Sequence, residues 1–381
     1  MEEDINQMDI FSSSELPPFK FTKPIKVIEL FAGYGSQMMA FEYLGKNAEH
    51  FKICEWAAPS IIAYNNIHVR DFTDYSFNKD VGSLARWLAE RGVSIDYNKP
   101  ATFEQLKRKP ESWIREVYNS IIATKDTVDI SRTTGNDFRL ENREDYNVFM
   151  SYSFPCQDLS LAGKRLGMDE NSNTRSSLLW QVGRILEEMN DINQLPDVLM
   201  MENVPQVIAG KNVRSFNKWL SKLDDLGYDS YCKILNATEF GIPQSRKRMF
   251  VISVKKKYSY EFPKPTNLTK RLKDFIEDDV DRKYYVSNKT IENISRWHTN
   301  QNPLKTLDME ICKTITAKSN TALNMNSLFI TDKPIPIGSI HETGKNHTHS
   351  MAINTEGISY TLTASDNHHP VIIYKDRLTI R

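Results

Sequence analysis

The stretch Lys26–Ser36, KVIELFAGYGS, decides the fold of this 381-residue chain. It begins as an apolar, β-branched run, turns at two glycines, and continues into the helix-compatible residues QMMAFEYLG. A buried strand, a glycine turn and a helix in this order make up the first unit of a doubly wound α/β sheet. We therefore expect such a sheet to begin here.

Strands and helices continue to alternate as far as about Val254, which predicts a mostly parallel sheet. The charged, partly helical residues from about 69 to 128 indicate an insertion between sheet elements. After Val254 the chain is rich in Asn, Thr, Lys and Pro, so we expect a smaller, irregular domain containing β-structure there. The expected strands are residues 51–56, 146–154, 196–204 and 247–254, and the expected helices are residues 176–189 and 216–228.

The net charge is zero, but its distribution is uneven. Residues 241–381 carry 22 Lys and Arg against 14 Asp and Glu, and they hold six of the eight histidines. A basic segment attached to an acidic body is typical of an enzyme with a nucleic-acid-binding domain. An excess of basic side chains on a solvated face explains the same numbers.

No run of 18 apolar residues is present, and the acidic N-terminus lacks the apolar core of a signal peptide. We therefore expect a cytoplasmic protein without a membrane segment. The four cysteines are Cys54, Cys156, Cys232 and Cys312, and they lie far apart with no CxxC or Cys/His pairing. This spacing argues against a metal site and a disulfide framework, so any special cysteine is expected to be a reduced thiol.

The glycine turn and Glu55 together indicate a site for a nucleoside ligand. Glu55 follows Gly35 by 20 residues and ends the second expected strand, a spacing that suits a carboxylate bound to ribose hydroxyls. Met38 stands where a dinucleotide fingerprint has its third glycine, so a ligand without a pyrophosphate fits better. The alternative is that the glycines only shape a tight turn.

Reactive side chains follow three further strands. Cys156 comes directly after Pro155 at a strand end, and Glu202 follows the apolar run VLMM. Arg246 and Arg248 precede or enter another strand, and alternation places them on one side. Each has a simpler explanation: an inert buried thiol, a surface acid, or a solvated strand edge.

The order of these motifs resembles that of the DNA (cytosine-5) methyltransferases. SFPCQ is followed by ENV 46 residues after the cysteine and by QSRKR a further 42 residues on, all behind the glycine turn. TRSSLLW, residues 174–180, adds another family-like block. The resemblance spans about Lys26 to Val254 and is closest to bacterial or phage modification enzymes.

The resemblance implies methyl transfer from S-adenosylmethionine to C5 of a cytosine flipped out of a specific double-stranded DNA sequence. It assigns to Cys156 the thiolate that adds to C6 of the base. Glu202 is expected to bond N3 and the exocyclic amine, and Arg246 and Arg248 to steady the base carbonyl and the DNA backbone.

The resemblance also implies a set of cofactor residues. Phe31, Gly33 and Gly35 are expected around the amino-acid and adenosine parts, Glu55 at the ribose and Trp56 against the adenine. The acid that binds the adenine amino group is expected to be Asp137, with Asp129 as the rival. The remaining residues assigned to the cofactor site are Phe138, Pro155 and Leu178.

We expect residues 1–262 to form the catalytic domain and residues 263–376 a target-recognition domain that reads the DNA. Residues 377–381 are expected to begin the return to the catalytic domain, with a second polypeptide supplying the family's last motifs; a shortened gene is the alternative. Two other functions remain open: a catalytically impaired, DNA-binding subunit that needs a second polypeptide, and a methyltransferase acting on RNA cytosine. The basic C-terminal part favours DNA over RNA.

Overall fold

The computed structural model describes residues 16–155, 175–210 and 212–271, together with four short C-terminal strands. The chain forms two compact units. The first contains Met1–Ile234 and Arg248–Phe262, and the second contains Leu235–Lys247 and Pro263–Arg381.

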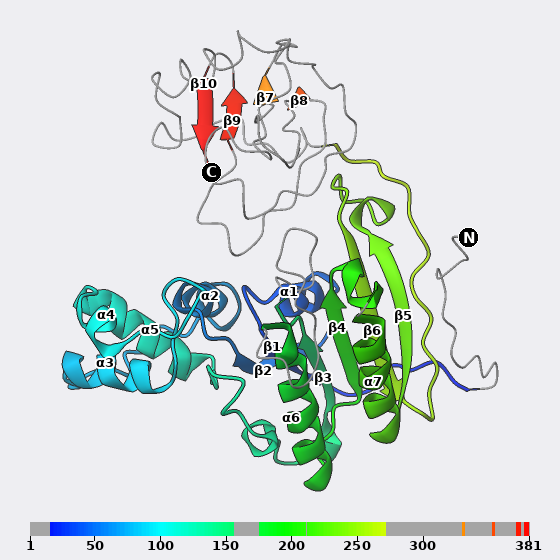
Figure 1. Cartoon of the computed structure of the whole chain (residues 1–381), viewed down its shortest axis with the longest axis horizontal. Helices are drawn as coiled ribbons and strands as arrows, with labels where there is room; N and C mark the ends of the chain where they lie inside the picture. Colours follow the sequence, from blue (N-terminus) through cyan, green and yellow to red (C-terminus); the bar gives the residue numbers. More distant parts are fainter. Residues whose placement is uncertain are drawn as a thin grey trace. The chain divides into compact units, whose positions relative to one another are not determined.

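A six-stranded sheet of order β2-β1-β3-β4-β6-β5 forms the centre of the fold (Figure 1). The strands β1 to β4 run parallel, whereas β6 pairs antiparallel with β4. The predicted doubly wound, mostly parallel α/β fold is therefore confirmed. The strands are β1 Ile25–Leu30, β2 Ala48–Cys54, β3 Asn147–Tyr152, β4 Val198–Asn203, β5 Tyr228–Asn236 and β6 Lys247–Lys255.

The strand order reverses beside β1, because β2 lies on one side of it and β3 on the other. Ligands of open α/β sheets bind at such a switch point, outside the carboxyl ends of the strands. The residues that follow β1, β2, β3 and β4 are therefore placed at one edge of the sheet, where the motifs of the sequence occur.

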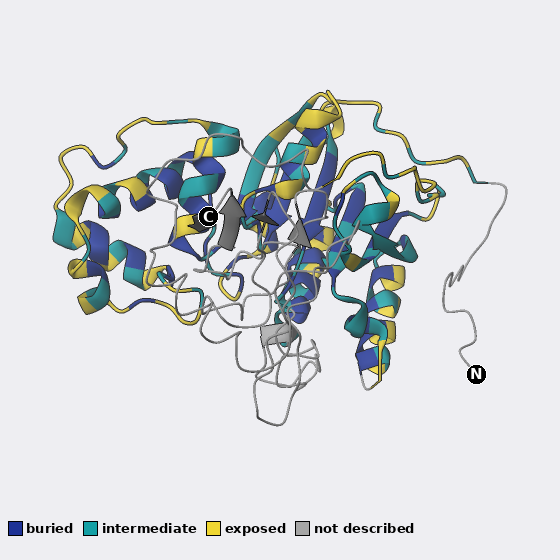
Figure 2. Ribbon diagram, turned by 90° about the horizontal axis from the view of Figure 1, so that it is seen from above, coloured by how far each residue is buried: buried dark blue, intermediate teal, exposed yellow. Residues whose placement is uncertain are grey.

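Alternation of side chains along β1 lets one strand serve a core on each face of the sheet. Val27 packs with Met38 of helix α1 (Ser36–Tyr43). Leu30 belongs to the larger cluster formed with α6 (Leu179–Asp191) and α7 (Asn212–Asp225). Figure 2 shows the buried residues concentrated in the strands and on the inner sides of the helices.

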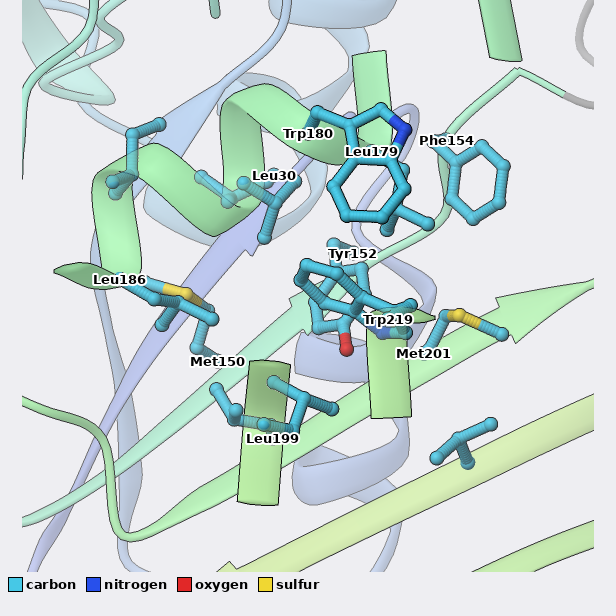
Figure 3. Close-up of a cluster of buried hydrophobic side chains, with 14 of the residues drawn as sticks. Leu30, Met150, Tyr152, Phe154, Leu179, Trp180, Leu186, Leu199, Met201 and Trp219 are labelled. Atoms are coloured by element: carbon cyan, nitrogen blue, oxygen red, sulfur yellow. The ribbon is translucent and has the colours of Figure 1, made fainter. Parts of the chain in front are cut away.

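Aromatic rings fill the core between the sheet and helices α6 and α7 (Figure 3). The Trp219 ring meets Tyr152 and Trp180 edge to face, with centroids 5.6 Å and 6.2 Å away. Edge-to-face pairs at such separations are favourable beyond the area they bury. This packing holds the strand that leads to Cys156 against two helices.

The insertion folds as a helical body with its own apolar core. Its helices are α3 (Val81–Glu90), α4 (Phe103–Lys107) and α5 (Glu111–Ala123), which lie together with α2 (Ala58–Tyr64) at one side of the sheet (Figure 1). Asp80 caps α3 by accepting from the Ser83 N–H, and Thr102 forms a capping box with Gln105.

Short helices connect many of these elements. They are η1 (Asn65–Val69), η2 (Gly135–Phe138), η3 (Arg143–Asp145), η4 (Arg175–Leu178), η5 (Pro205–Ile208) and η6 (Ala237–Glu239).

Four short strands are described in the second unit. β7 (Ile330–Thr331) runs parallel to β8 (Ile353–Asn354), and β9 (Val371–Tyr374) pairs antiparallel with β10 (Arg377–Ile380). β10 thus pairs with a strand of the same unit. Within the described ranges, every helix is too short or too polar to cross a bilayer.

Leu199→Ala should lower the free energy of unfolding by about 2–5 kcal/mol, because it opens a cavity in the core beneath α6 and α7. The matched control is Leu44→Ala, since Leu44 is 68% exposed and Leu199 is fully buried. Leu44→Ala should change stability by less than about 0.5 kcal/mol. Urea unfolding of both variants tests the core, and equal losses would contradict it.

Candidate functional site

The turn after β1 adopts a left-handed backbone at three of its positions. The φ angles are +56° at Phe31, +54° at Gly33 and +79° at Gly35. Gly35 is also tightly packed, since a Cβ there would lie 2.5 Å from His68 Nε2 and 2.6 Å from Tyr64 Cε2. The turn therefore needs glycine for both its conformation and the space around it.

Glu55 joins the ends of β1 and β2. Its carboxylate accepts a hydrogen bond from the Gly33 N–H (2.9 Å) and another from the Ala57 N–H (2.8 Å). Burial raises the pKa of this carboxyl, although the bonds to the backbone oppose the rise. A carboxylate oxygen has two acceptor positions, so each Glu55 oxygen can accept a further hydrogen bond from a ligand hydroxyl.

Asp126 holds Glu55 in place from the other side. Its Oδ1 accepts from the Glu55 N–H (3.0 Å) and the Val128 N–H (2.8 Å). Its Oδ2 is buried without a hydrogen-bond partner among the described residues. Burial raises the pKa of Asp126 well above its usual value, and the charge of Glu55 adds to the rise. Sequence reasoning missed Asp126, because a single acid outside any motif gave no signal.

Three other predicted cofactor residues border this edge. Trp56 packs partly against the core of the insertion, and its carbonyl accepts from the Ser94 N–H (2.7 Å). Leu178 ends η4 and packs partly on the core beneath α6. Pro155 is half-buried and follows β3.

Among the described residues, no contact joins Asp137 or Phe138 to Glu55. The Asp137 carboxylate accepts from the N–H (2.7 Å) and the hydroxyl (2.8 Å) of Thr134, which caps η2. Phe138 is 1% exposed within the core shared with α6.

The rival acid, Asp129, lies nearer to the end of β2 along the backbone. The segment that precedes it is bonded to this strand, since the Thr127 N–H donates to the Ile53 carbonyl (3.1 Å). The Asp129 carboxylate accepts from the N–H (2.9 Å) and the hydroxyl (2.7 Å) of Ser131.

Glu202 and Arg248 form an ion pair at the ends of β4 and β6, with Arg248 Nε 2.9 Å from Glu202 Oε1. Their side chains are 20% and 15% exposed, respectively. A guanidinium bonded to a carboxylate fixes the orientation of both groups. Arg246 belongs to the second unit, where its N–H donates to Asn236 Oδ1 (2.9 Å). The predicted nucleophile Cys156 lies outside the described residues.

Asn203 ties the end of β4 to the chain just before the cysteine. Its Nδ2 donates to the Phe154 carbonyl (3.0 Å), and its Oδ1 accepts from the Val204 N–H (2.8 Å). Asn203 is 3% exposed, so these bonds satisfy a buried amide. This positions the chain entering Cys156 beside the strand that carries Glu202.

Polar side chains near the glycine turn form hydrogen bonds with the turn and with the start of α1. Glu29 on β1 accepts from the Tyr64 hydroxyl (2.7 Å) and from the Gln37 N–H (3.2 Å) at the start of α1. His68 bonds the Tyr34 carbonyl (2.9 Å) within the turn. Burial raises the pKa of Glu29 to about 7, although Tyr64 opposes the rise.

Comparison with known proteins points to one family. The model for "C-5 cytosine-specific DNA methylase" matches residues 103–370. "Orphan methyltransferase M.SssI" of Spiroplasma monobiae is 35% identical over 274 residues, which cover 70% of this chain and 68% of that protein. "Type II methyltransferase M2.ScrFI" of Lactococcus lactis subsp. cremoris is 34% identical over 272 residues, which cover 70% of this chain and 71% of that protein.

Among solved structures, the S. pombe Dnmt2 methyltransferase is similar with a TM-score of 0.47 and 17% identity. The match covers 77% of this chain and 72% of that chain.

Gly35→Ala should destabilise the protein by about 3 kcal/mol or more, because the new Cβ adds a collision to an unfavourable left-handed conformation. Gly45→Ala is the matched control, since Gly45 has a φ of +58° but no atom within 4 Å of a new Cβ. It should cost only about 1 kcal/mol. Urea unfolding measures both, and equal costs would show that packing at Gly35 is unimportant.

The free energy of unfolding of the wild type should fall as pH rises, and Glu29→Gln should abolish this fall. The unfolded carboxyl ionises near its usual value of 4.5, whereas the folded one holds its proton to about 7. Wild-type stability should therefore fall by about 3 kcal/mol across this window. The variant should lack this fall in urea unfolding, and the exposed Glu90→Gln should retain it. Parallel wild-type and Glu29→Gln profiles would contradict the buried acid.

Proposed function

Because the chain belongs to the C-5 cytosine-specific DNA methylase family, we propose that it methylates C5 of a flipped cytosine within a specific double-stranded DNA sequence through a Cys156 adduct. Membership itself makes the chain a DNA (cytosine-5)-methyltransferase that depends on S-adenosylmethionine. The flipping, the adduct and the sequence specificity are the proposal.

The base must be activated because C5 of cytosine is a poor nucleophile. The Cys156 thiolate forms a bond to C6, which gives C5 enamine character. C5 would then bond the methyl group as the methyl–sulfur bond of S-adenosylmethionine breaks and S-adenosylhomocysteine leaves. A base takes the proton from C5, and the electron pair of that bond restores the double bond as the thiolate leaves C6.

The Glu202–Arg248 pair is the observation that carries this proposal. Arg248 holds one oxygen of Glu202 at 2.9 Å and thereby orients the carboxylate at the end of β4. A carboxyl group oriented in this place can, in its protonated form, donate to N3 of the base as charge develops during addition and can accept from the exocyclic amine. Asn203 places the chain that leads to Cys156 beside it. Arg246 is proposed to steady the base carbonyl and the DNA backbone.

The other cysteines of the described chain are poor candidates for the nucleophile. Burial raises the pKa of Cys232 to about 12. The pKa of Cys54 is raised further, by complete burial and by the charge of Asp126. A buried thiol with a raised pKa holds little thiolate at neutral pH. Cys156 and Cys312 remain, and only Cys156 lies in the SFPCQ motif that carries the resemblance.

The residues around Glu55 fit the nucleoside part of S-adenosylmethionine. The buried Glu55 carboxylate is proposed to accept hydrogen bonds from the ribose hydroxyls in addition to those from the backbone, and Gly35 adds no side chain to the turn. Phe31, Gly33 and Trp56 are proposed to border the same ligand, with Pro155 and Leu178 on the far side.

For the acid that meets the adenine, the geometry favours Asp129 over Asp137. The segment before Asp129 is bonded to the end of β2, which is the distinction between them, because both carboxylates also have local partners. Phe138 is proposed to support the site from the core rather than to touch the ligand, because it is 1% exposed.

The second unit is proposed to recognise the DNA sequence. Its residues carry 18 Lys and Arg against 14 Asp and Glu, a small positive excess that suits contacts with phosphates. The domain bounds of 1–262, 263–376 and 377–381, the dependence on a second polypeptide and a cytoplasmic location stay predictions from the sequence.

Cys156→Ser should abolish methyl transfer to double-stranded DNA while leaving DNA binding largely intact, because it removes only the nucleophile. Cys232→Ser is the matched control and should retain activity. Transfer is measured with labelled S-adenosylmethionine, and DNA containing 5-fluorocytosine should trap a covalent adduct at Cys156, since fluorine cannot leave as a proton. Label on adenine N6 or cytosine N4, or an adduct at another cysteine, would overturn the proposal.

A further inference from the structure

The insertion is fastened directly to the chain that follows Glu55. The Ser94 N–H donates to the Trp56 carbonyl (2.7 Å), and the Ser94 carbonyl accepts from the Ala58 N–H (2.9 Å). These two bonds form a short parallel bridge between the insertion and the start of α2. The loop that follows Ser94 therefore begins next to the proposed cofactor site.

Tyr97 is the residue of this loop that reaches back to the site. Its hydroxyl lies 3.2 Å from Ser60 Oγ on α2. Burial raises the pKa of Tyr97 to about 12; the bond to Ser60 opposes the rise, and the Tyr34 hydroxyl and the charge of Glu55 add to it. Tyr34 belongs to the glycine turn, so Tyr97 lies among groups from α2, the turn and the end of β2.

The backbone at Tyr97 is held in an unfavourable conformation. Its φ is +60°, in the left-handed region that bulky residues rarely adopt. Asp96 supports this turn of the chain, because its Oδ1 accepts from the Asn98 N–H (2.9 Å). Phe31 and Val128, with φ of +56° and +65°, are also left-handed and lie at the same edge of the sheet. Such outliers persist where surrounding contacts overdetermine them, and they gather at ligand sites.

We propose that Tyr97 is a positioning residue for the cofactor, supplied by the insertion: its hydroxyl, bonded to Ser60, holds α2 beside the chain that follows Glu55. This inference rests on the proposed function. It assigns the insertion a part in S-adenosylmethionine binding, in addition to its own helical core. The bond to Ser60 fixes the orientation of the Tyr97 ring.

The test compares two tyrosines of the insertion that each use a hydroxyl. Tyr97→Phe removes the bond to Ser60, and Tyr75→Phe removes the bond from Tyr75 to Asp71 Oδ2 (2.6 Å), which is remote from Glu55 in the hydrogen-bond network. Calorimetry measures the affinity of the whole 381-residue chain for S-adenosylhomocysteine. Thermal melting and steady-state methylation are measured on the same samples.

Tyr97→Phe should weaken S-adenosylhomocysteine binding about three- to tenfold, the loss expected from one hydrogen bond. The KM for S-adenosylmethionine should rise by a similar factor with kcat unchanged at saturation, and Tyr75→Phe should bind as the wild type does. Ser60→Ala should reproduce the loss, and the double variant should lose no more than the larger single loss.

A lower melting temperature with unchanged affinity would make Tyr97 merely structural and overturn the inference. Glu55→Gln separates this failure from that of the proposed function. If Glu55→Gln weakens binding and Tyr97→Phe does not, the cofactor site stands and the role of Tyr97 is wrong. If Glu55→Gln binds S-adenosylhomocysteine as the wild type does, the proposed cofactor site itself is wrong.

Discussion

The buried carboxylate of Glu55 is the constraint on which the candidate site depends. It accepts one N–H from the turn after β1 and another from the start of α2, so the ends of two adjacent strands are held by one side chain. An acid in this position is expensive to bury unless hydrogen bonds compensate it. Asp126 completes the arrangement by taking the backbone N–H of Glu55 itself. The shape of the glycine turn and the position of the residues that follow β2 therefore have a common cause.

Much of the sheet could be predicted because its strands are short apolar runs with clear ends. The pattern of β1 and the glycines behind it fixed the fold class, and helical spacing identified the region of α6 and α7. β5 was missed, since YDSYCKILN is mostly half-buried and alternates weakly. The antiparallel direction of β6 was also missed, because direction depends on pairing with β4 and leaves no local signal.

The sequence predicted only those residues of the candidate site that belong to recognisable motifs. Glu202 and Arg248 were named from sequence, and the structure joins them in an ion pair. Asp126 and Tyr97 act through backbone N–H groups and through neighbours distant in the chain, so their positions follow from tertiary packing. Asp137 was named from the resemblance, which does not reveal that its carboxylate caps η2.

Two histidines, one at each end of the insertion, bear on which parts of the insertion can change during evolution. His68 bonds the glycine turn just before the insertion begins, and His50 on β2 bonds the Thr124 carbonyl (2.8 Å) where it ends. The two ends of the insertion are thus hydrogen-bonded to the glycine turn and to the sheet. These bonds do not involve the helices between the two ends. Since lengthening a loop between fixed ends costs little entropy, most of the intervening helices could be exchanged during evolution without disturbing the sheet. The short loop around Tyr97 would be the part that such an exchange has to preserve.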